Sequence, residues 1–514
     1  MKQYPGSGTL LLEHAAKVSA GFLRQYRVPF FSSLLFGLLA YGFWFTNKLV
    51  NHDEVSSLFT KGGTVSSGRW GLGALDSILP NYSTPWIYGI LTIFLMALAV
   101  CFMVRMFCVQ NKALQALTAG CVVVFPSLIG LFGYMFTSAA FALAFLLAVT
   151  AAALVQDLRK WLILPALGCL ILSLSIYQSY ISIAASLLVL SLIRQLLKGE
   201  APEKILLKGI CYVVFLVAAL GSYYLGTQII LKVTGNELNS YASGNLAFSV
   251  SSVVQGTVLA YRNFFRFFTE SFEGLIPTAF SRLLHWILMA SIAALLLIQL
   301  FRKKNIPFAA SGLLVLLIAM LPLAINCMYM ITTPDSIHTL VLYGFVAVYL
   351  LAVILADRFV SEPVPFSGLV LNALTGTMAL VIAVNIYVAN QASLHLHLRY
   401  ENASAFYTSL IADIKMNPGF DKGTKLAVIG EYQQPDYYTD KFEWLHNITG
   451  VYGFVPDSYS KNYFLEYYTG FPMDFATEEE IARITASAEF EAMAVYPYYG
   501  SLQKIGNILV VKLS

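Results

Sequence analysis

The chain has 514 residues, of which 58% are hydrophobic and only 12% are charged, and its mean hydropathy is +0.69. A soluble domain carries roughly 25% charged residues, so a soluble chain of this composition would lack the polar surface that keeps a protein in water. The net charge of +4 is too small to indicate a nucleic-acid partner. The composition excludes a cytosolic enzyme, a nucleic-acid-binding protein and a disordered chain, and it indicates an α-helical polytopic membrane protein.

Charge is distributed unevenly along the chain. Residues 1–390 hold 23 basic and 13 acidic side chains and nearly all of the long apolar runs, whereas residues 391–514 hold 9 basic and 15 acidic ones. We expect a transmembrane domain at 1–390 and a soluble α/β domain at 391–514, which is long enough to bury a small core. Within this tail, the patterns predict helices at 391–414 and from 477, and strands at 425–430 and 507–513. Its aromatic stretch 432–472 is read either as a sugar-stacking surface or as a loop packed on the membrane domain.

Spans of about 20 apolar residues are needed to cross a bilayer. Eleven segments meet this requirement: 28–47, 86–107, 113–133, 137–155, 161–177, 178–196, 209–231, 283–301, 307–330, 339–356 and 366–389. The fifth and sixth are read either as a hairpin or as one kinked helix, and the fourth either as a span or as a re-entrant segment. With a cytoplasmic N-terminus, the cytoplasmic segments hold 16 basic residues and the opposite loops hold 7, which fits the positive-inside rule. An odd number of spans then places the tail outside the cytoplasm.

The first long outer loop, 48–85, carries the most informative charges. His52, Asp53 and Glu54 come directly after the first span, and Gly68-Arg69-Trp70 and then Asp76 follow. A carboxylate at the membrane interface can serve as a general base toward a hydroxyl, and an arginine can bind a phosphate through two hydrogen bonds. The alternative reading is an ordinary solvated loop whose charges mark the membrane boundary.

The second long outer loop, 232–282, contains Arg262 and Arg266 among aromatic residues. Their i, i+4 spacing places both cations on one face of a helix. We expect this helix to lie in the membrane interface, where the cations either hold a lipid phosphate or simply snorkel to the surface, with Glu270 and Glu273 as pairing partners. Further candidates for lining a cleft are His285, Asp335 and His338, each of which also fits a helix cap or surface role, and the turn residues Tyr177, Gln178 and Tyr180.

These motifs resemble a known family. The acidic pair after the first span, the Gly68-Arg69-Trp70 motif and the Ser175–Tyr180 turn are similar to those of GT-C glycosyltransferases, and specifically of the bacterial O-antigen glucosyltransferases of seroconverting phage and glycan-modification clusters. The resemblance implies a bacterial cytoplasmic-membrane enzyme that uses a polyprenyl-phosphate hexose, typically glucose, as donor. The implied acceptor is a hydroxyl of a surface glycan, in some cases lipid-linked, and the implied partners are the membrane proteins that make and flip the donor.

The resemblance also implies roles for individual residues. Asp53 is the first choice for the base that activates the acceptor hydroxyl in an inverting transfer, and Glu54 is the second. Arg69 is the motif's phosphate-binding candidate. A divalent metal such as Mg²⁺ or Mn²⁺ held by Asp53 and Glu54 is left open.

Two other readings of the sequence compete with the enzyme. A transporter or flippase of lipid-linked glycans would share the span count and the charge bias, and a scaffold for glycan assembly is a third reading. The almost charge-free spans argue against a proton-coupled transporter, which usually buries ionisable residues in mid-membrane.

Overall fold

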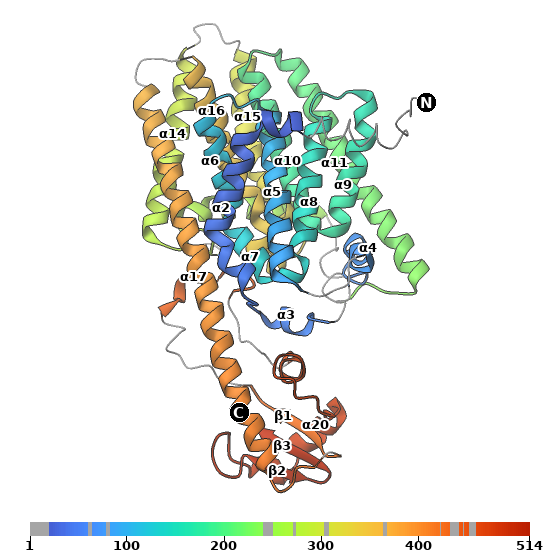
Figure 1. Ribbon diagram of the computed structural model, residues 1–514. Helices are drawn as coiled ribbons and strands as arrows, with labels where there is room; N and C mark the ends of the chain where they lie inside the picture. The colour runs from blue at the N-terminus through green and yellow to red at the C-terminus, as the bar shows by residue number, and fades with distance from the viewer. Residues whose placement is uncertain are drawn as a thin grey trace, which may run out of the picture.

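The structure is a computed structural model of the chain, and it describes residues 20–59, 64–78, 83–239, 250–270, 274–302, 308–362, 367–421, 423–431, 441–445, 447–451 and 459–514. Figure 1 shows a bundle of long helices with a small sheet-containing tail at one end. This arrangement confirms the predominantly helical membrane-protein architecture with a small C-terminal sheet. We refer to the end of the bundle nearest the sheet as the tail-side end.

Eight helical segments of the described chain are long and apolar enough to cross a membrane. They are α2 (Arg27–Thr46), α5 (Pro85–Phe107), α8 (Met135–Val155), α10 (Ile181–Leu197) with the short helix η1 (Gln178–Tyr180), α11 (Pro202–Thr234), α14 (Ala279–Arg302), η5 (Thr339–Phe345) with α16 (Val346–Ser361), and α17 (Ser367–Met416). A bent pair, α6 (Lys112–Val123) and α7 (Pro126–Gly133), and two shorter apolar helices, α9 (Lys160–Ile176) and α15 (Phe308–Ile325), complete the set. Each of the eleven predicted segments therefore contains apolar helix, while the number that cross the bilayer stays a prediction.

Local sequence explains where several of these helices begin and break. Helices α5, α7 and α11 each begin with a proline. Proline is well tolerated there because the first backbone N–H of a helix has no partner within the helix. The Asn111 side chain caps α6 by accepting from the N–H groups of Ala113 and Leu114 at 2.9 and 3.1 Å. Pro126 interrupts the third predicted segment with a 43° bend. The predicted re-entrant alternative for the fourth segment falls on α8, which is one unbroken helix of 21 residues.

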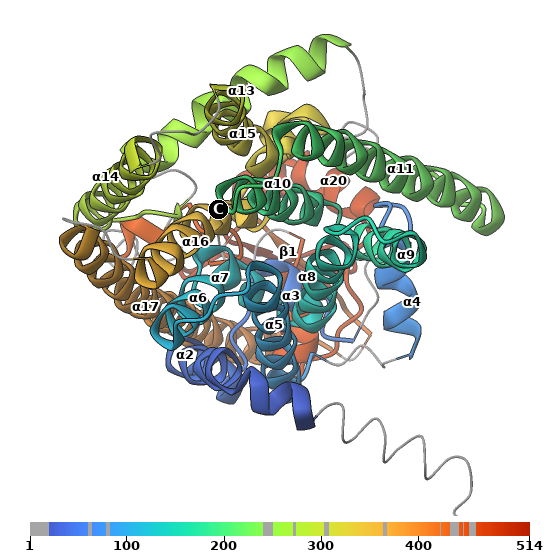
Figure 2. The same cartoon turned by 90° about the horizontal axis from the view of Figure 1, so that it is seen from above.

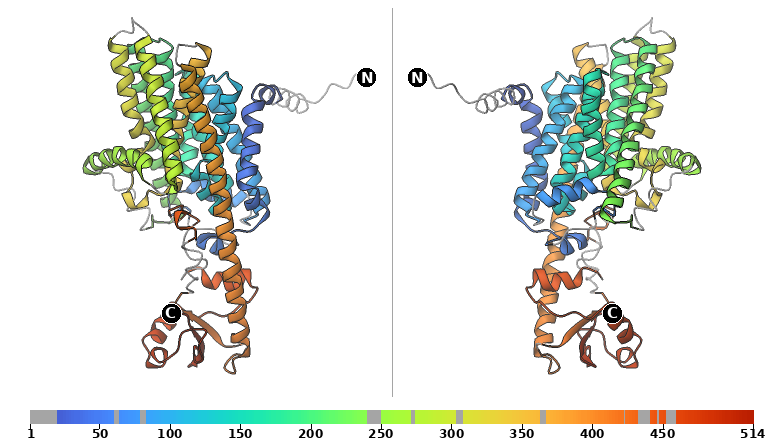
Figure 3. Two further views of the ribbon diagram at one scale, coloured as in Figure 1. Left: turned by 90° about the vertical axis from the view of Figure 1, so that its left-hand side faces the viewer. Right: turned by 90° about the vertical axis from the view of Figure 1, so that its right-hand side faces the viewer.

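Helix α13 (Val250–Thr269) lies across the bundle helices near its tail-side end, as Figure 3 shows. Phe264 and Phe267 are buried on one side of it, and Phe267 stacks on Phe345 with ring centroids 4.1 Å apart. Arg262 and Phe265 are exposed on the other side. The helix predicted in the second outer loop is thus present, with one buried side and one exposed side.

The tail is built on the continuation of α17 and a three-stranded sheet. Strands β1 (Lys425–Ile429), β2 (Leu502–Ile505) and β3 (Ile508–Lys512) are arranged in the order β1-β3-β2, with β1 parallel and β2 antiparallel to β3. Short helices α19 (Lys461–Tyr463), η7 (Phe464–Tyr468), α20 (Glu478–Thr485) and α21 (Ala488–Glu491) accompany it. Thr477 and Glu480 form the capping box that the sequence predicts at the start of α20. The predicted division at residue 390 falls inside the 50-residue helix α17, which belongs to bundle and tail alike.

A short helix from the first outer loop joins the two parts. Helix α3 (His52–Ser56) lies between the bundle and the tail in Figure 1. Val50 and Val55 are fully buried in the tail's apolar core, together with Tyr407, Phe464 and Leu509. The first outer loop is therefore anchored by tail residues that follow it by more than 350 positions.

Segment 447–451 packs against the bundle so closely that Gly133 at the end of α7 has no room for a side chain. A Cβ at Gly133 would lie 2.7 Å from the Gly450 carbonyl oxygen and 3.0 Å from its Cα. We expect Gly133→Ala to lower the free energy of unfolding by about 1–3 kcal/mol, because backbone must move to admit the methyl group. The thermal unfolding midpoint of the detergent-purified protein measures this. The control Gly168→Ala, in α9 with nothing within 4 Å, should leave the midpoint unchanged or raise it, and equal midpoints for the two variants would contradict this packing.

Candidate functional site

Glu54 is a buried carboxylate that ties α3 to the bundle. Its side chain is completely buried and pairs with Lys48, which follows the first span. The Ser83 hydroxyl donates to the same carboxylate oxygen, and the backbone N–H of Phe136 at the start of α8 donates to the other at 3.1 Å. Asn51 caps α3 by accepting from the Glu54 N–H at 2.8 Å. A charged lysine and two hydrogen-bond donors thus compensate the cost of burying the Glu54 carboxylate.

Asp53, the adjacent residue, faces the tail. Neighbouring residues on a helix point about 100° apart, so Asp53 cannot share the environment of Glu54. Its side chain is 45% exposed, accepts a hydrogen bond from the Tyr459 hydroxyl and lies 3.7 Å from Nε2 of His52. The two adjacent acids thus occupy different surroundings: Glu54 is buried inside the fold, and Asp53 is partly exposed to solvent.

The Gly68-Arg69-Trp70 motif packs against the Ser175–Tyr180 turn, a contact that the sequence analysis did not predict. Gly68 has a φ of +73° and its carbonyl accepts from the Tyr223 hydroxyl at 3.0 Å. Gln178 donates to that hydroxyl at 2.8 Å and to the Ser67 carbonyl at 3.3 Å. Trp70, which opens α4 (Trp70–Ile78), donates to the Thr227 hydroxyl of α11 at 3.2 Å. These contacts fix the backbone on both sides of Arg69.

Arg69 is held by aromatic rings rather than by a carboxylate. The carbon at the centre of its guanidinium lies 5.4 Å from the ring centroid of Tyr177 and 5.9 Å from that of Phe141, and these two rings stack on each other. Its Nε is buried without a hydrogen-bond partner, and no ion pair involves Arg69 in the described part of the chain. A cation that is held in place and forms no ion pair among the described residues is suited to binding an anion.

His338 lies near Arg69 and is also incompletely paired. Its Nδ1 is buried with no hydrogen-bond partner among the described residues. Burial, with a smaller contribution from the positive charge of Arg69, lowers the pKa of His338 to about 4. The imidazole is therefore neutral at pH 7 and can donate one N–H to an anion beside Arg69.

Asp53 and Glu54 do not fit a shared metal ion. The Glu54 carboxylate is already engaged by Lys48, Ser83 and Phe136, while Asp53 points to the tail. In the described ranges, no group of three His, Cys, Asp or Glu side chains is placed to hold a metal. We therefore assign no metal-dependent step to this pair.

The other predicted site residues are placed in several different surroundings. Asp76 lies on α4. Both Asp76 and Glu54 are close enough to Tyr88 to interact with it electrostatically. Tyr180 is buried against Phe145 and Tyr343. Asp335 is exposed on a short helix, Pro334–Ser336.

His285 and the α13 arginines lie apart from the Arg69 surroundings. The two ring nitrogens of His285 lie 2.7 Å from the Ser281 carbonyl and 2.6 Å from the Tyr349 hydroxyl, inside the bundle. Arg266 pairs with Glu270 at 2.8 Å, and the predicted partner Glu273 is outside the described residues. Figure 2 shows α13 running beside α14 and α15, across the bundle from α4.

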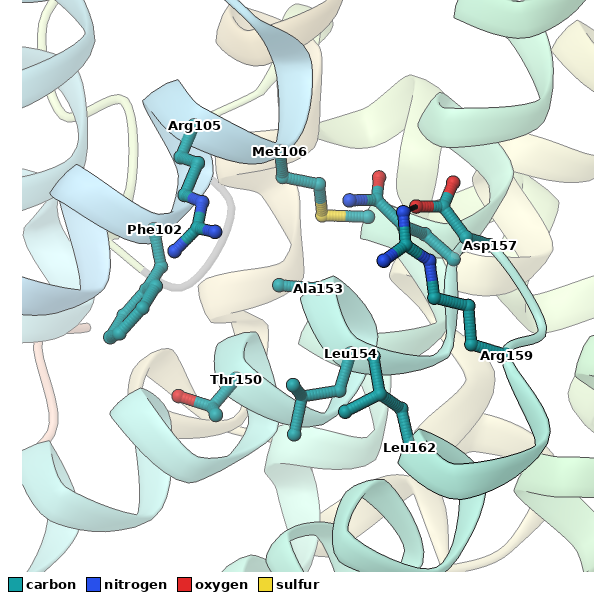
Figure 4. A pocket seen from close by; sticks show the side chains of 10 residues that line it. Phe102, Arg105, Met106, Thr150, Ala153, Leu154, Asp157, Arg159 and Leu162 are labelled. Atoms are coloured by element: carbon teal, nitrogen blue, oxygen red, sulfur yellow. Dashed lines mark ion pairs between the residues drawn. The ribbon is translucent and has the colours of Figure 1, made fainter.

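A cavity of about 180 Å³ lies at the other end of the bundle, between the ends of α5 and α8 and the start of α9. Figure 4 shows the side chains that line it, among them Arg105 and Arg159, with an ion pair of 3.9 Å between Arg159 and Asp157. None of its lining residues belongs to the predicted site.

Sequence reasoning missed three side chains that act on the acidic pair. Lys48 and Ser83 hold Glu54, and Tyr459 holds Asp53. Lys48 could have been recognised from the sequence, because it follows the first span and precedes Glu54 by six residues. Tyr459 lies 406 positions from Asp53, and no local pattern connects the two.

The structure combines an apolar helical bundle with an exposed carboxylate, Asp53, and with an arginine, Arg69, that forms no ion pair among the described residues. A family model described as "Glucosyl transferase GtrII" matches residues 42–351, which is more than half of the chain. The protein therefore belongs to the GtrII glucosyl transferase family, as the sequence motifs predicted. No protein of curated function and no solved structure matched the chain.

Removing Glu54 should destabilise the protein because Lys48 would lose its buried partner. We expect Glu54→Ala to lower the free energy of unfolding by roughly 3 kcal/mol, whereas Asp53→Asn at the exposed neighbour should change it by about 0.5 kcal/mol or less. Thermal unfolding of the two purified variants compares them directly. Equal destabilisation by both would show that Glu54 is not the structural member of the pair.

His338 should make the stability of the protein depend on pH in the acid range. Its pKa is about 4 in the fold and about 6.5 in an unfolded chain, so the unfolded state takes up the proton first. The contribution of His338 to the free energy of unfolding is therefore fully present above pH 6.5. About 3 kcal/mol of this free energy is lost as the pH falls through 6.5 toward 4. His338→Gln should remove this part of the pH dependence of the unfolding midpoint. Parallel profiles for the variant and the wild type would contradict the assignment.

Proposed function

We propose that the protein transfers a hexose, most simply glucose, from a polyprenyl-phosphate carrier to a hydroxyl of a surface glycan such as O-antigen, with inversion at the anomeric carbon. The observation that carries this proposal is the separation of the two adjacent acids: Glu54 is buried with Lys48, whereas Asp53 is 45% exposed beside His52, in a member of a glucosyl transferase family. The reaction is placed at the outer face of a bacterial cytoplasmic membrane, on the tail side.

Asp53 acts as the general base in this proposal. Its carboxylate accepts the proton of the acceptor hydroxyl while that oxygen attacks the anomeric carbon of the donor sugar. The bond between the anomeric carbon and the phosphate oxygen breaks, and its electron pair leaves with the lipid phosphate. Because attack and departure occur on opposite faces of the sugar, the configuration inverts. The Tyr459 hydroxyl orients the carboxylate by donating to one of its oxygens.

Arg69 and His338 would stabilise the leaving phosphate. The guanidinium is fixed by Tyr177 and Phe141 and has no carboxylate partner in the described chain, and the neutral imidazole supplies a second donor. Donors fixed in advance of the reaction stabilise developing negative charge without a cost of reorganisation. In this proposal Arg262 and Arg266, on α13, would meet lipid phosphate groups at the membrane interface.

The structure supports an enzyme over the transporter alternative. The side chains proposed for chemistry lie at the tail-side end, where α3 meets the start of α8 and the residues before α4 meet η1. A transporter would instead need a substrate path along the bundle axis with polar groups at mid-membrane. The membrane body belongs to a glucosyl transferase family.

The test is glucosyl transfer by the full-length protein in lipid nanodiscs. Radiolabelled polyprenyl-phosphate glucose and nucleotide-linked glucose are supplied separately, with surface glycan from cells that lack the protein as acceptor. We expect label to reach the glycan only from the lipid-linked donor. Transfer from the nucleotide sugar would overturn the proposed donor, and no transfer from either, by folded protein, would favour the transporter.

Arg69→Gln tests the phosphate site in the same assay. Loss of this donor should reduce the rate of transfer about 100-fold or more, and Arg69→Lys should restore only part of it because a lysine lacks the planar fork. The control is Lys232→Gln, an exposed cation near the tail-side end of α11, which should transfer at the wild-type rate. An Arg69→Gln variant as active as Lys232→Gln would remove Arg69 from the site.

A further inference from the structure

The tail presents a row of tyrosines near Asp53. Tyr463 ends α19 and Tyr467 lies four residues later in η7, so the two rings are neighbours on this helical segment, and Tyr459 lies in the turn just before α19. Phe464 and Leu465, on the other side, are completely buried in the tail core. The row is therefore the outward side of a firmly packed segment.

An exposed ring from the first outer loop extends this row. Phe59 follows α3 and meets Tyr467 edge to face, with centroids 5.0 Å apart. The Tyr467 ring in turn lies 5.6 Å from that of Tyr463. Phe59, Tyr459 and Tyr463 are 54%, 47% and 37% exposed. We name Phe59, Tyr459, Tyr463 and Tyr467 together the aromatic surface.

The aromatic surface borders the proposed base. Tyr459 donates its hydroxyl hydrogen bond to Asp53, and its ring meets that of His52 edge to face at 6.0 Å. A molecule lying on Tyr463 and Tyr467 would thus extend toward the exposed carboxylate.

The chemistry of the surface fits a carbohydrate. A pyranose ring has faces of C–H groups that pack on aromatic rings and an edge of hydroxyls that hydrogen-bond to phenols, and tyrosine offers both features at low entropic cost. We propose that the aromatic surface binds the acceptor glycan and presents one of its hydroxyls to Asp53. This inference rests on the proposed function and names the acceptor subsite of that same reaction.

The position of this surface in the chain has a consequence for specificity. Asp53, Arg69 and Phe59 lie inside the family-matched region 42–351, whereas the three tyrosines lie in the tail beyond it. The transfer chemistry and the recognition of the acceptor are then carried by different segments. A change of tail residues can alter the glycan that is modified without altering the reaction.

The experiment measures transfer at varied acceptor concentration with saturating polyprenyl-phosphate glucose. Tyr463→Ala/Tyr467→Ala should raise the KM for the surface glycan about tenfold or more, equivalent to about 1.4 kcal/mol of binding free energy. The KM for the donor and the kcat at saturating acceptor should stay at the wild-type values, because the contact is the same in ground and transition states. Tyr463→Phe/Tyr467→Phe keeps the rings and should restore most of the affinity.

The matched control is Tyr498→Ala/Tyr499→Ala, which removes two tyrosines that are 74% and 104% exposed on the turn before β2. It should leave the acceptor KM unchanged. The inference is overturned if the Tyr463/Tyr467 alanine variant keeps the wild-type acceptor KM, if the control raises it equally, or if the donor KM rises instead. Should the double variant fail to fold, Tyr463→Ala alone decides the question in the same way. A wild type that transfers no glucose would overturn the proposed function and this inference together.

Discussion

The buried ion pair between Glu54 and Lys48 is the constraint on which the proposed site depends. A carboxylate taken fully out of water is costly unless a charge and hydrogen bonds compensate it, and here Lys48, Ser83 and the Phe136 N–H do so. Once Glu54 is fixed toward the bundle, the helical geometry of α3 turns Asp53 about 100° away, toward the tail. Two acids that are identical in charge and adjacent in sequence are thereby assigned to stability and, in our proposal, to chemistry.

The same short helix couples the bundle to the tail. Glu54 attaches α3 to the start of α8, while Val50 and Val55 insert into the tail core. Any displacement of the tail would therefore move Asp53 relative to the bundle, where Arg69 is held by the rings of Tyr177 and Phe141. Tight placement of a base relative to a leaving-group site is a large part of what catalysis of group transfer requires. The tail is, on this account, a working part of the site rather than an appendage.

The sequence predicted the features that local patterns determine. Apolar runs located all eleven helical segments, the Thr477–Glu480 box located α20, and two short motifs located the Arg69 and Gln178 neighbourhoods that the fold brings together. It ranked Asp53 before Glu54 only through the family resemblance, and it did not predict that Glu54 is buried, because the partners that bury Glu54 lie elsewhere in the chain. Tyr459 could not be anticipated for the same reason, and the antiparallel strand β2 is too short and polar to be recognised alone. Spacing placed Arg262 and Arg266 on a helix correctly, but only the fold shows that α13 lies across the bundle from α4.

The most direct test of the central claim is to measure glucosyl transfer and thermal unfolding on the same preparation of Asp53→Asn. The substitution removes the proposed base but keeps the size of the side chain and leaves the Glu54–Lys48 pair intact. The account predicts an unfolding midpoint equal to that of the wild type and transfer reduced by at least about 100-fold, the lower range of what a positioned base contributes. A folded Asp53→Asn protein that transfers glucose at the wild-type rate would contradict the account and move the base to another residue.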